Sequence, residues 1–319
     1  MRALLVLLAA AAAHAAGPCT TATPNCSEFV SVGGGPARTM VYRSQPLTVK
    51  NEKITRALIV IHGTERNADS YFRSTLAAAF LADALEDTVL IAPHIVSAAG
   101  GCHDILAPNE VSWNCSSWRT GGPAIGNEKL TTFDMVDDLL KRLAKRDVFP
   151  NLKLIVLAGH SAGGQFVGRY EMSNRVHESL GVPVRYVVSN PSSYAWIDAT
   201  RPNDVPASCA NYNRWPYGFE NRSGYAARVS EEDLLKQLAS RPTTYLLGQI
   251  DILPLGGFDA SCSAMAQGPT RLARGQAFGK YVNEKLDAGH ETVEIELCGH
   301  NARCMFTADK ALPVLFPKQ

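Results

Sequence analysis

The sequence carries almost no net charge and no long run of basic residues. Its 319 residues include 31 Lys and Arg against 30 Asp and Glu, which gives a formal net charge of +1. Proteins that bind nucleic acids usually show a basic surplus or a basic stripe on their surface. The composition therefore argues against nucleic acid as a partner.

Two further patterns are missing from the chain. No Cys-x-x-Cys or His-x-x-x-His spacing occurs, so no zinc site is indicated. Beyond the N-terminal segment, no apolar run approaches the ~20 residues that a membrane-spanning helix needs. Hydrophobic residues still make up 46% of the chain, which is enough to bury a large core. We therefore expect a globular protein without a metal and without stable membrane insertion.

The N-terminal segment reads MRALLVLLAAAAAHAAGPC. One positive charge, Arg2, precedes an apolar stretch that ends in the small-residue pattern Ala13-His14-Ala15. This pattern predicts a secretory signal peptide over residues 1–15, cleaved after Ala15. A membrane anchor is the alternative, but the stretch is shorter than the ~20 residues of a spanning helix. We expect the mature protein to be secreted or periplasmic.

Eight cysteines follow the predicted cleavage site, and an even number in an exported chain indicates disulfide bonds. Sequence spacing cannot fix which cysteines pair. A nearest-neighbour scheme joins three close pairs and leaves the remaining two cysteines to each other. The predicted pairs are Cys19 with Cys26, Cys102 with Cys115, Cys298 with Cys304, and Cys209 with Cys262.

Short apolar runs alternate with amphipathic segments along most of the chain. The runs predict strands that are covered on both faces, and the alternation predicts a mostly parallel sheet with helices on both sides. Two antiparallel edge strands are expected over 30–49, on either side of a glycine-rich break. The buried strands are expected at 57–61, 88–92, 152–158, 184–189, 243–247 and 292–297, and the helices at 71–85, 131–145, 164–172 and 272–288. The predicted fold class is α/β.

Two segments depart from this alternation. Residues 97–127 are rich in Gly, Ser, Asn, Trp and Cys and predict a long loop held by Cys102 and Cys115. Residues 192–240 predict an insertion that caps the site, within a single domain over 16–319. Thr132 is the expected N-cap of the helix at 131–145.

The stretch GHSAG, residues 159–163, matches the pattern Gly-x-Ser-x-Gly. It follows a predicted strand and precedes a predicted helix. A sharp strand-to-helix turn of this kind exposes the hydroxyl of its serine, and glycines on either side allow the close backbone approach. The context predicts Ser161 to be a nucleophile rather than part of a structural turn.

A serine hydroxyl needs a base, and the base needs an orienting acid. Three histidines follow Ser161, and only His300 directly follows a predicted strand; His177 and His290 lie in or beside helices. Asp251 follows the strand at 243–247 and is the predicted acid. Asp259 is the second choice, and Asp198 and Asp204 lie in the predicted insertion.

The developing oxyanion needs hydrogen-bond donors. The backbone N–H of Ala162 is one expected donor. His62-Gly63-Thr64 follows an earlier strand, so the N–H of Thr64 or Glu65 is the expected second donor.

With these motifs in order, the chain from Ala57 onward resembles serine hydrolases of the α/β-hydrolase superfamily. It is similar to secreted esterases related to polyhydroxyalkanoate depolymerases and feruloyl esterases. The resemblance implies a Ser161 acyl-enzyme, His300 as base and then acid, Asp251 as its orienting partner, and no metal or organic cofactor. The implied partner is a small or polymeric ester.

Aromatic side chains in the irregular segments are candidates for substrate contact or, equally, for small local cores. Peptide hydrolysis by an exported peptidase is the main alternative activity. A non-catalytic binding protein is disfavoured because all three triad members are present, and no amphipathic lid helix suggests an interfacial lipase. The candidate substrate-binding residues are His62, Glu65, Trp113, Trp118 and Tyr194.

Overall fold

The computed structural model describes residues 17–318. The predicted signal peptide, residues 1–15, lies outside the described residues. Among the helices of residues 17–318, none is both long and apolar enough to cross a membrane.

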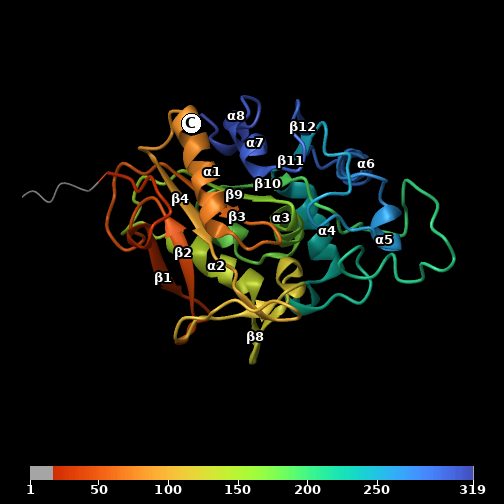
Figure 1. The fold of residues 1–319 in the computed structure, drawn as a ribbon, viewed down its shortest axis with the longest axis horizontal. Helices are drawn as coiled ribbons and strands as arrows, with labels where there is room; N and C mark the ends of the chain where they lie inside the picture. The colour runs from red at the N-terminus through yellow and green to blue at the C-terminus, as the bar shows by residue number, and fades with distance from the viewer. Residues whose placement is uncertain (1–16, 319) are drawn as a thin grey trace, which may run out of the picture.

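An eight-stranded sheet forms the centre of the molecule, in the order β1-β2-β4-β3-β9-β10-β11-β12 (Figure 1). β2 pairs antiparallel with β1 and with β4, and the other neighbours run parallel. This arrangement confirms the predicted α/β class and the antiparallel edge. The strands are β1 (Ser27–Ser31), β2 (Arg38–Arg43), β3 (Arg56–Ile61), β4 (Thr88–Pro93), β9 (Leu154–His160), β10 (Val184–Ser189), β11 (Thr243–Gly248) and β12 (Glu291–Ile295).

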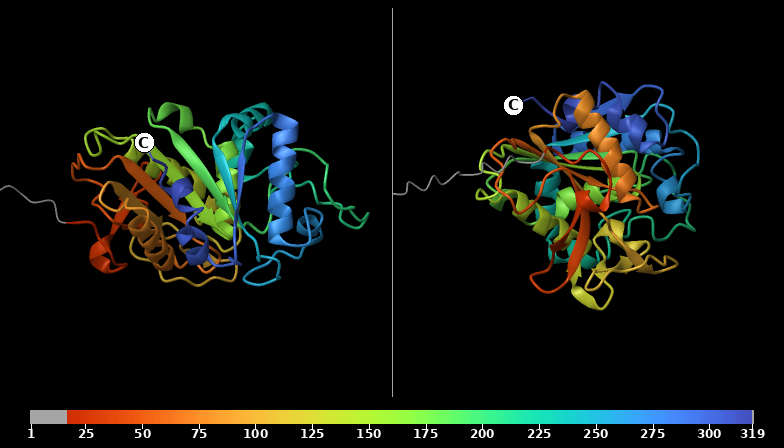
Figure 2. Two further views of the ribbon diagram at one scale, coloured as in Figure 1. Left: turned by 90° about the horizontal axis from the view of Figure 1, so that it is seen from above. Right: turned by 60° about the vertical axis from the view of Figure 1, so that its left-hand side comes forward.

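Helices cover both faces of the sheet and enclose two apolar cores. The core under α2, α3, α4 and α6 takes Ile59 and Ile61 from β3, whereas the core under α1, α7 and α8 takes Leu58 and Val60. Successive strand residues point to opposite faces, which explains the unbroken apolar runs. Figure 2 shows α6 standing beside the sheet at the end opposite β1. The α-helices are α1 (Ala68–Leu81), α2 (Thr132–Leu143), α3 (Ala162–Ser173), α4 (Glu231–Ser240), α5 (Cys262–Met265), α6 (Arg271–Leu286), α7 (Ala302–Thr307) and α8 (Leu312–Leu315).

The segment 97–127, expected to be a loop, contains most of a small second sheet. Its strands are β5 (Ser97–Ala99), β6 (Trp113–Asn114), β7 (Pro123–Ala124) and β8 (Asn127–Thr131), with the 3-10 turn η2 (Ser117–Thr120) between them. Strands of this length are too short to show a period in the sequence. The sheet forms around Trp113 and Trp118, which have no exposed surface.

One local prediction is corrected. Thr131, not Thr132, is the N-cap of α2, and its hydroxyl accepts from the Asp134 N–H in a capping box. The insertion 192–240 holds α4 and the 3-10 turn η4 (Gly224–Arg228). The other 3-10 turns are η1 (Pro24–Cys26) and η3 (His177–Ser179).

The four predicted disulfide bonds are confirmed. Each bonded pair is the one that the nearest-neighbour scheme gives: Cys19–Cys26, Cys102–Cys115, Cys209–Cys262 and Cys298–Cys304.

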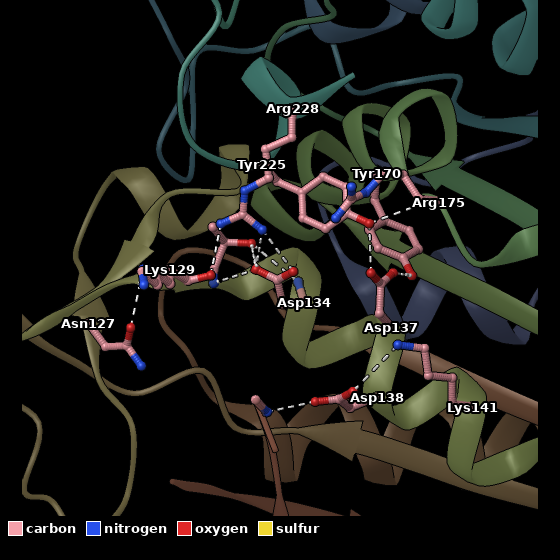
Figure 3. A network of polar contacts seen from close by, with 12 residues as sticks. Asn127, Lys129, Asp134, Asp137, Asp138, Lys141, Tyr170, Arg175, Tyr225 and Arg228 are labelled. Carbon is pink, nitrogen blue, oxygen red and sulfur yellow. Dashed lines mark hydrogen bonds and ion pairs between the residues drawn. The ribbon is translucent and has the colours of Figure 1, made fainter. Parts of the chain in front are cut away.

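A buried polar network ties the insertion 192–240 to the main helices (Figure 3). The carboxylate of Asp137 on α2 accepts from the hydroxyls of Tyr170 on α3 and Tyr225 on η4, both at 2.6 Å. Arg228 of η4 pairs with Asp134 of α2 at 2.9 Å. The insertion is therefore anchored against the α2–α3 face of the sheet.

Candidate active site

Ser161 stands in the turn between β9 and α3, with φ 61° and ψ −120°. A positive φ at a non-glycine residue is strained and persists only where the surrounding structure enforces it. A Cβ at Gly159 would lie 2.2 Å from the carbonyl oxygen of Gly163, and one at Gly163 would lie 2.1 Å from that of Ile61. Only glycine therefore fits two residues before and two residues after Ser161, which is the physical basis of the GHSAG pattern.

The structure brings Ser161, His300 and Asp251 into one hydrogen-bonded line. Ser161 Oγ lies 2.9 Å from His300 Nε2, and His300 Nδ1 lies 2.7 Å from Asp251 Oδ2. A carboxylate only accepts hydrogen bonds, so Nδ1–H donates to it and Nε2 accepts from the serine hydroxyl. Ser161, Asp251 and His300 follow β9, β11 and β12 respectively, at the carboxyl ends of parallel strands of one sheet.

The alternative acids and bases lie elsewhere. Asp259 accepts from the Tyr217 hydroxyl at 2.7 Å, Asp198 pairs with Lys285, and Asp204 is exposed. The Nδ1 atoms of His177 and His290 contact the hydroxyls of Tyr186 and Tyr245. Among the described histidines, only His300 forms a hydrogen bond with the Ser161 side chain.

A buried arginine contacts the second oxygen of Asp251. Arg271, the first residue of α6, has no exposed surface, and its Nη1 lies 3.4 Å from Asp251 Oδ1. Its other nitrogens donate to Ser192 Oγ at 2.7 Å and to the Gly256 carbonyl at 2.9 Å. A Cβ at Gly256 would lie 3.0 Å from His300 Cδ2. Arg271 thus fixes both Asp251 and the loop that packs on the His300 imidazole.

A second histidine packs against His300. The ring of His160, the residue before Ser161, has its centroid 4.7 Å from that of His300. Its Nδ1 lies 3.1 Å from the Tyr71 hydroxyl. Burial, together with the positive charge that His300 and Arg271 can carry, holds the pKa of His160 well below its usual range. His160 is therefore neutral and packs beside His300 without adding charge.

The turn predicted to form the oxyanion hole lies beside Ser161. A Cβ at Gly63 would lie 3.6 Å from Ser161 Cβ. Ala162 begins α3, so its N–H has no partner within the helix. Arg66 holds the turn, because its N–H donates to the Gly63 carbonyl and its Nη1 donates to the Thr64 carbonyl.

The same arginine is held by the Cys102–Cys115 loop. Arg66 Nε and Nη2 donate to the Asp104 carboxylate at 2.7 and 2.9 Å. Asp104 also accepts from the Ser97 N–H at 2.8 Å. The hydrogen bonds from Arg66 lower the pKa of Asp104 to about 2, so this carboxylate remains charged across the neutral range. The disulfide-bonded loop therefore supports the Gly63–Thr64 turn through Arg66.

A cavity of about 500 Å³ opens in front of Ser161 and His300. Its walls come from the turn after β3, the first turns of α1, the loop after β11, and the start of α7. The lining residues are Gly63, Thr64, Glu65, Asn67, Ser70, Tyr71, Arg73, Ser74, His160, Ser161, Gly256, Gly257, His300, Asn301, Ala302 and Arg303. Among the described residues, none of the insertion 192–240 lines this cavity.

Of the predicted substrate-binding residues, the structure places only Glu65 in the cavity wall. Trp113 and Trp118 are fully buried in the core beneath the small sheet, and Tyr194 is stacked on Phe278 with ring centroids 4.5 Å apart. These aromatic side chains belong to the large core under α2, α3, α4 and α6 rather than to the small local cores that the sequence left open.

His62 is also a supporting residue rather than part of the cavity wall. Its Nδ1–H donates to the Gly63 carbonyl at 2.9 Å, and its Nε2 accepts from the Ile95 N–H at 3.0 Å. Burial lowers the pKa of His62 to about 3. A neutral His62 thus ties the end of β3 to the segment after β4.

Arg271, Asp104 and the role of His160 were not found from the sequence. No local pattern marks an arginine that will be fully buried, since most arginines are exposed. His160 lies inside the GHSAG pattern, so its position was visible, but its contact with His300 arises from packing between residues far apart in the chain.

Three features together define the α/β-hydrolase fold: the strand order, the sharp turn between β9 and α3 that carries Ser161, and the positions of Asp251 and His300 after later strands. No protein-family model matches the chain, and no curated protein shows a significant sequence match. Among solved structures, the chain is similar to the LpqC poly(3-hydroxybutyrate) depolymerase from Bordetella parapertussis, with a TM-score of 0.64 and 20% identity, covering 91% of this chain and 87% of that one. It is also similar to poly(aspartic acid) hydrolase-1 from Sphingomonas sp. KT-1, with a TM-score of 0.59 and 23% identity, covering 88% and 94%. At these identities the likeness concerns the fold.

Proposed function

We infer that the chain is a serine hydrolase that cleaves carboxylic esters, with Ser161 as nucleophile, His300 as general base and acid, and Asp251 as the residue that orients His300. The observation that carries this proposal is the unbroken hydrogen-bonded line from Asp251 through His300 to Ser161, ending on a strained, glycine-flanked turn. The fold shared with the poly(3-hydroxybutyrate) depolymerase and the poly(aspartic acid) hydrolase supports it.

In the proposed mechanism each residue has its own step. Ser161 Oγ attacks the ester carbonyl carbon while His300 Nε2 takes the hydroxyl proton. The negative charge that develops on the carbonyl oxygen is met by the backbone N–H groups of Ala162 and Thr64. His300 then returns the proton to the leaving alcohol, and water that His300 activates hydrolyses the acyl-Ser161 ester.

Asp251 acts through His300. Its Oδ2 accepts the Nδ1 proton, which leaves Nε2 free to accept from Ser161 and stabilises the imidazolium that forms. None of these steps calls for a metal or an organic cofactor.

We place this reaction outside the cytoplasm, in the periplasm or the surrounding medium. The four disulfide bonds support an oxidising compartment. The predicted signal peptide agrees with this placement.

Covalent labelling tests the assignment. A fluorophosphonate should modify Ser161, as peptide mass spectrometry would show, and Ser161→Ala should remove both the label and the hydrolysis of p-nitrophenyl butanoate. The variant should keep the thermal unfolding profile of the wild type. Hydrolysis that survives in folded Ser161→Ala would reject the proposal. A parallel panel of aryl esters, polyester films and peptides separates an esterase from a peptidase, and inactivity toward the whole panel would favour a binding protein.

A further inference from the structure

A second cavity adjoins the one in front of Ser161. Its volume is about 560 Å³, and it lies between α1 and the start of α7. Arg73 of α1 and Arg303 of α7 line both cavities, so the two adjoin at these side chains and are here together named the trough. The second cavity, here named the distal groove, is lined by Thr20, Arg73, Leu76, Ala77, Phe80, Leu81, Leu85, Arg303 and Thr307.

The distal groove is mainly apolar and open to solvent. Its apolar residues on α1 recur at the three- and four-residue spacing that places side chains on one helix face. Phe80 and Leu81 are 74% and 56% exposed, although both are large and hydrophobic. Adjacent exposed hydrophobic residues that line a groove are typical of a binding surface, whereas isolated ones need no explanation.

The trough changes character along its length. Beside Ser161 its wall is polar, with Asn67, Ser70 and Ser74. The two arginines follow. Arg73 pairs with Asp69, and the Arg303 guanidinium has no hydrogen-bond or ion-pair partner among residues 17–318. Beyond them the wall is aliphatic and aromatic. Arginine side chains can line an apolar path with their methylene stems while their charged ends remain in water.

Resting on the proposed ester hydrolysis, we propose that the distal groove binds the extended apolar chain of the substrate, whose ester carbonyl lies at Ser161. Its position adjoining the nucleophile's cavity selects this occupant. At 1.5 Å per helical residue, α1 advances about 16 Å from Ser70 to Leu81, enough to accompany a long aliphatic chain. The favoured substrate class is therefore esters of medium- and long-chain aliphatic acids or alcohols rather than acetates and butanoates.

The test compares p-nitrophenyl butanoate, octanoate and dodecanoate, each kept below its aggregation concentration. The wild type should show kcat/KM rising with chain length, because each buried methylene favours binding by roughly fourfold. In the double variant Phe80→Ser/Leu81→Ser, the ratio of kcat/KM for dodecanoate to that for butanoate should fall about tenfold or more. Ile105→Ser, at a residue that is 95% exposed and absent from both cavities, is the matched control and should keep the wild-type ratio.

A binding measurement separates this proposal from the proposed function. In Ser161→Ala, the dodecanoate ion should bind with an affinity that the double substitution weakens about tenfold, as measured by calorimetry. If the double variant is active and keeps the wild-type ratio of kcat/KM for dodecanoate to that for butanoate, the groove proposal is wrong and the esterase proposal is unaffected. If the wild-type protein hydrolyses none of the three esters, the proposed esterase activity is rejected instead. A double substitution that altered only sedimentation, from dimer to monomer, would identify the groove as a contact between copies and also overturn the proposal.

Discussion

Arg271 and Asp251 form a buried ion pair behind the proposed catalytic histidine. The guanidinium lies 3.4 Å from Asp251 Oδ1, while Oδ2 accepts from His300 at 2.7 Å. Both side chains of the pair are almost wholly removed from water, with exposures of 0% and 1%. A buried charge without its partner is strongly destabilising. Asp251 is therefore held in place by a side chain from α6.

Two substitutions of Arg271 should distinguish the effect of its positive charge from the effect of its hydrogen-bond geometry. Arg271→Lys keeps a cation but cannot bond Ser192, Gly256 and Asp251 together, so we expect kcat to fall roughly tenfold through misplacement of Asp251 and His300. Arg271→Met leaves Asp251 unpaired and should lower the free energy of unfolding by about 3–5 kcal/mol. Ester kinetics and urea unfolding measure the two effects. Wild-type kcat in Arg271→Lys would show that one buried cation of any shape suffices.

Asparagine substitutions of the two candidate acids, Asp251 and Asp259, should affect kcat very differently. Asp251→Asn should lower kcat by about 10⁴-fold, because an asparagine that donates to Nδ1 imposes the wrong histidine tautomer. Asp259→Asn should leave kcat near the wild-type value, since Asp259 contacts Tyr217 and the backbone of Ser261 rather than His300. Single-turnover and steady-state rates on a short ester measure both. A large loss in Asp259→Asn with none in Asp251→Asn would reverse the assignment.

The loop closed by Cys102–Cys115 should influence catalysis through Arg66. Asp104→Ala removes both carboxylate contacts of Arg66, so the Gly63–Thr64 turn loosens, and we expect kcat to fall about ten- to hundredfold, less than the loss of a whole oxyanion donor. Asp87→Ala breaks a comparable pair with Arg56 at the amino ends of β3 and β4 and serves as the control. Equal kinetic effects in the two variants would contradict a specific link to the turn.

Stability should depend on pH through Asp137. Burial raises its pKa from 3.8 to about 6, against the lowering effect of the Tyr170 and Tyr225 hydroxyls; Asp134 raises it and Lys141 lowers it. The unfolded carboxyl therefore loses its proton at lower pH than the folded one. The folded state binds more protons between pH about 4 and 6, so this group's contribution to the free energy of unfolding decreases as pH rises through that window.

Asp137→Asn removes this contribution. The stability of the wild type relative to the variant should decrease by up to about 3 kcal/mol between pH 4 and pH 7. Urea unfolding at several pH values measures the difference, and Asp138→Asn, a more exposed neighbour on α2, is the control. A pH-independent difference between wild type and Asp137→Asn would show that the carboxyl titrates alike in both states.

Local steric rules made much of the scaffold predictable. Apolar runs that fill both faces of a parallel sheet gave the positions of β3, β4, β9, β10 and β11 within two residues at either end. The glycines around Ser161 follow from backbone approaches within that turn and to β3. The order of strands placed Asp251 and His300 in the loops where the structure brings them together.

Side-chain neighbours from distant segments were decided only in three dimensions. The sequence by itself determined the fold class and the positions of Ser161, Asp251 and His300 directly after strands, because strand periodicity and turn sterics act over short stretches. Tertiary structure decided that Arg271 is buried behind Asp251, that Trp113 and Trp118 belong to the large core, and that α1 and α7 enclose a groove. Those features depend on which helix faces meet, and a helix shows its apolar face in the sequence without showing what will lie against it.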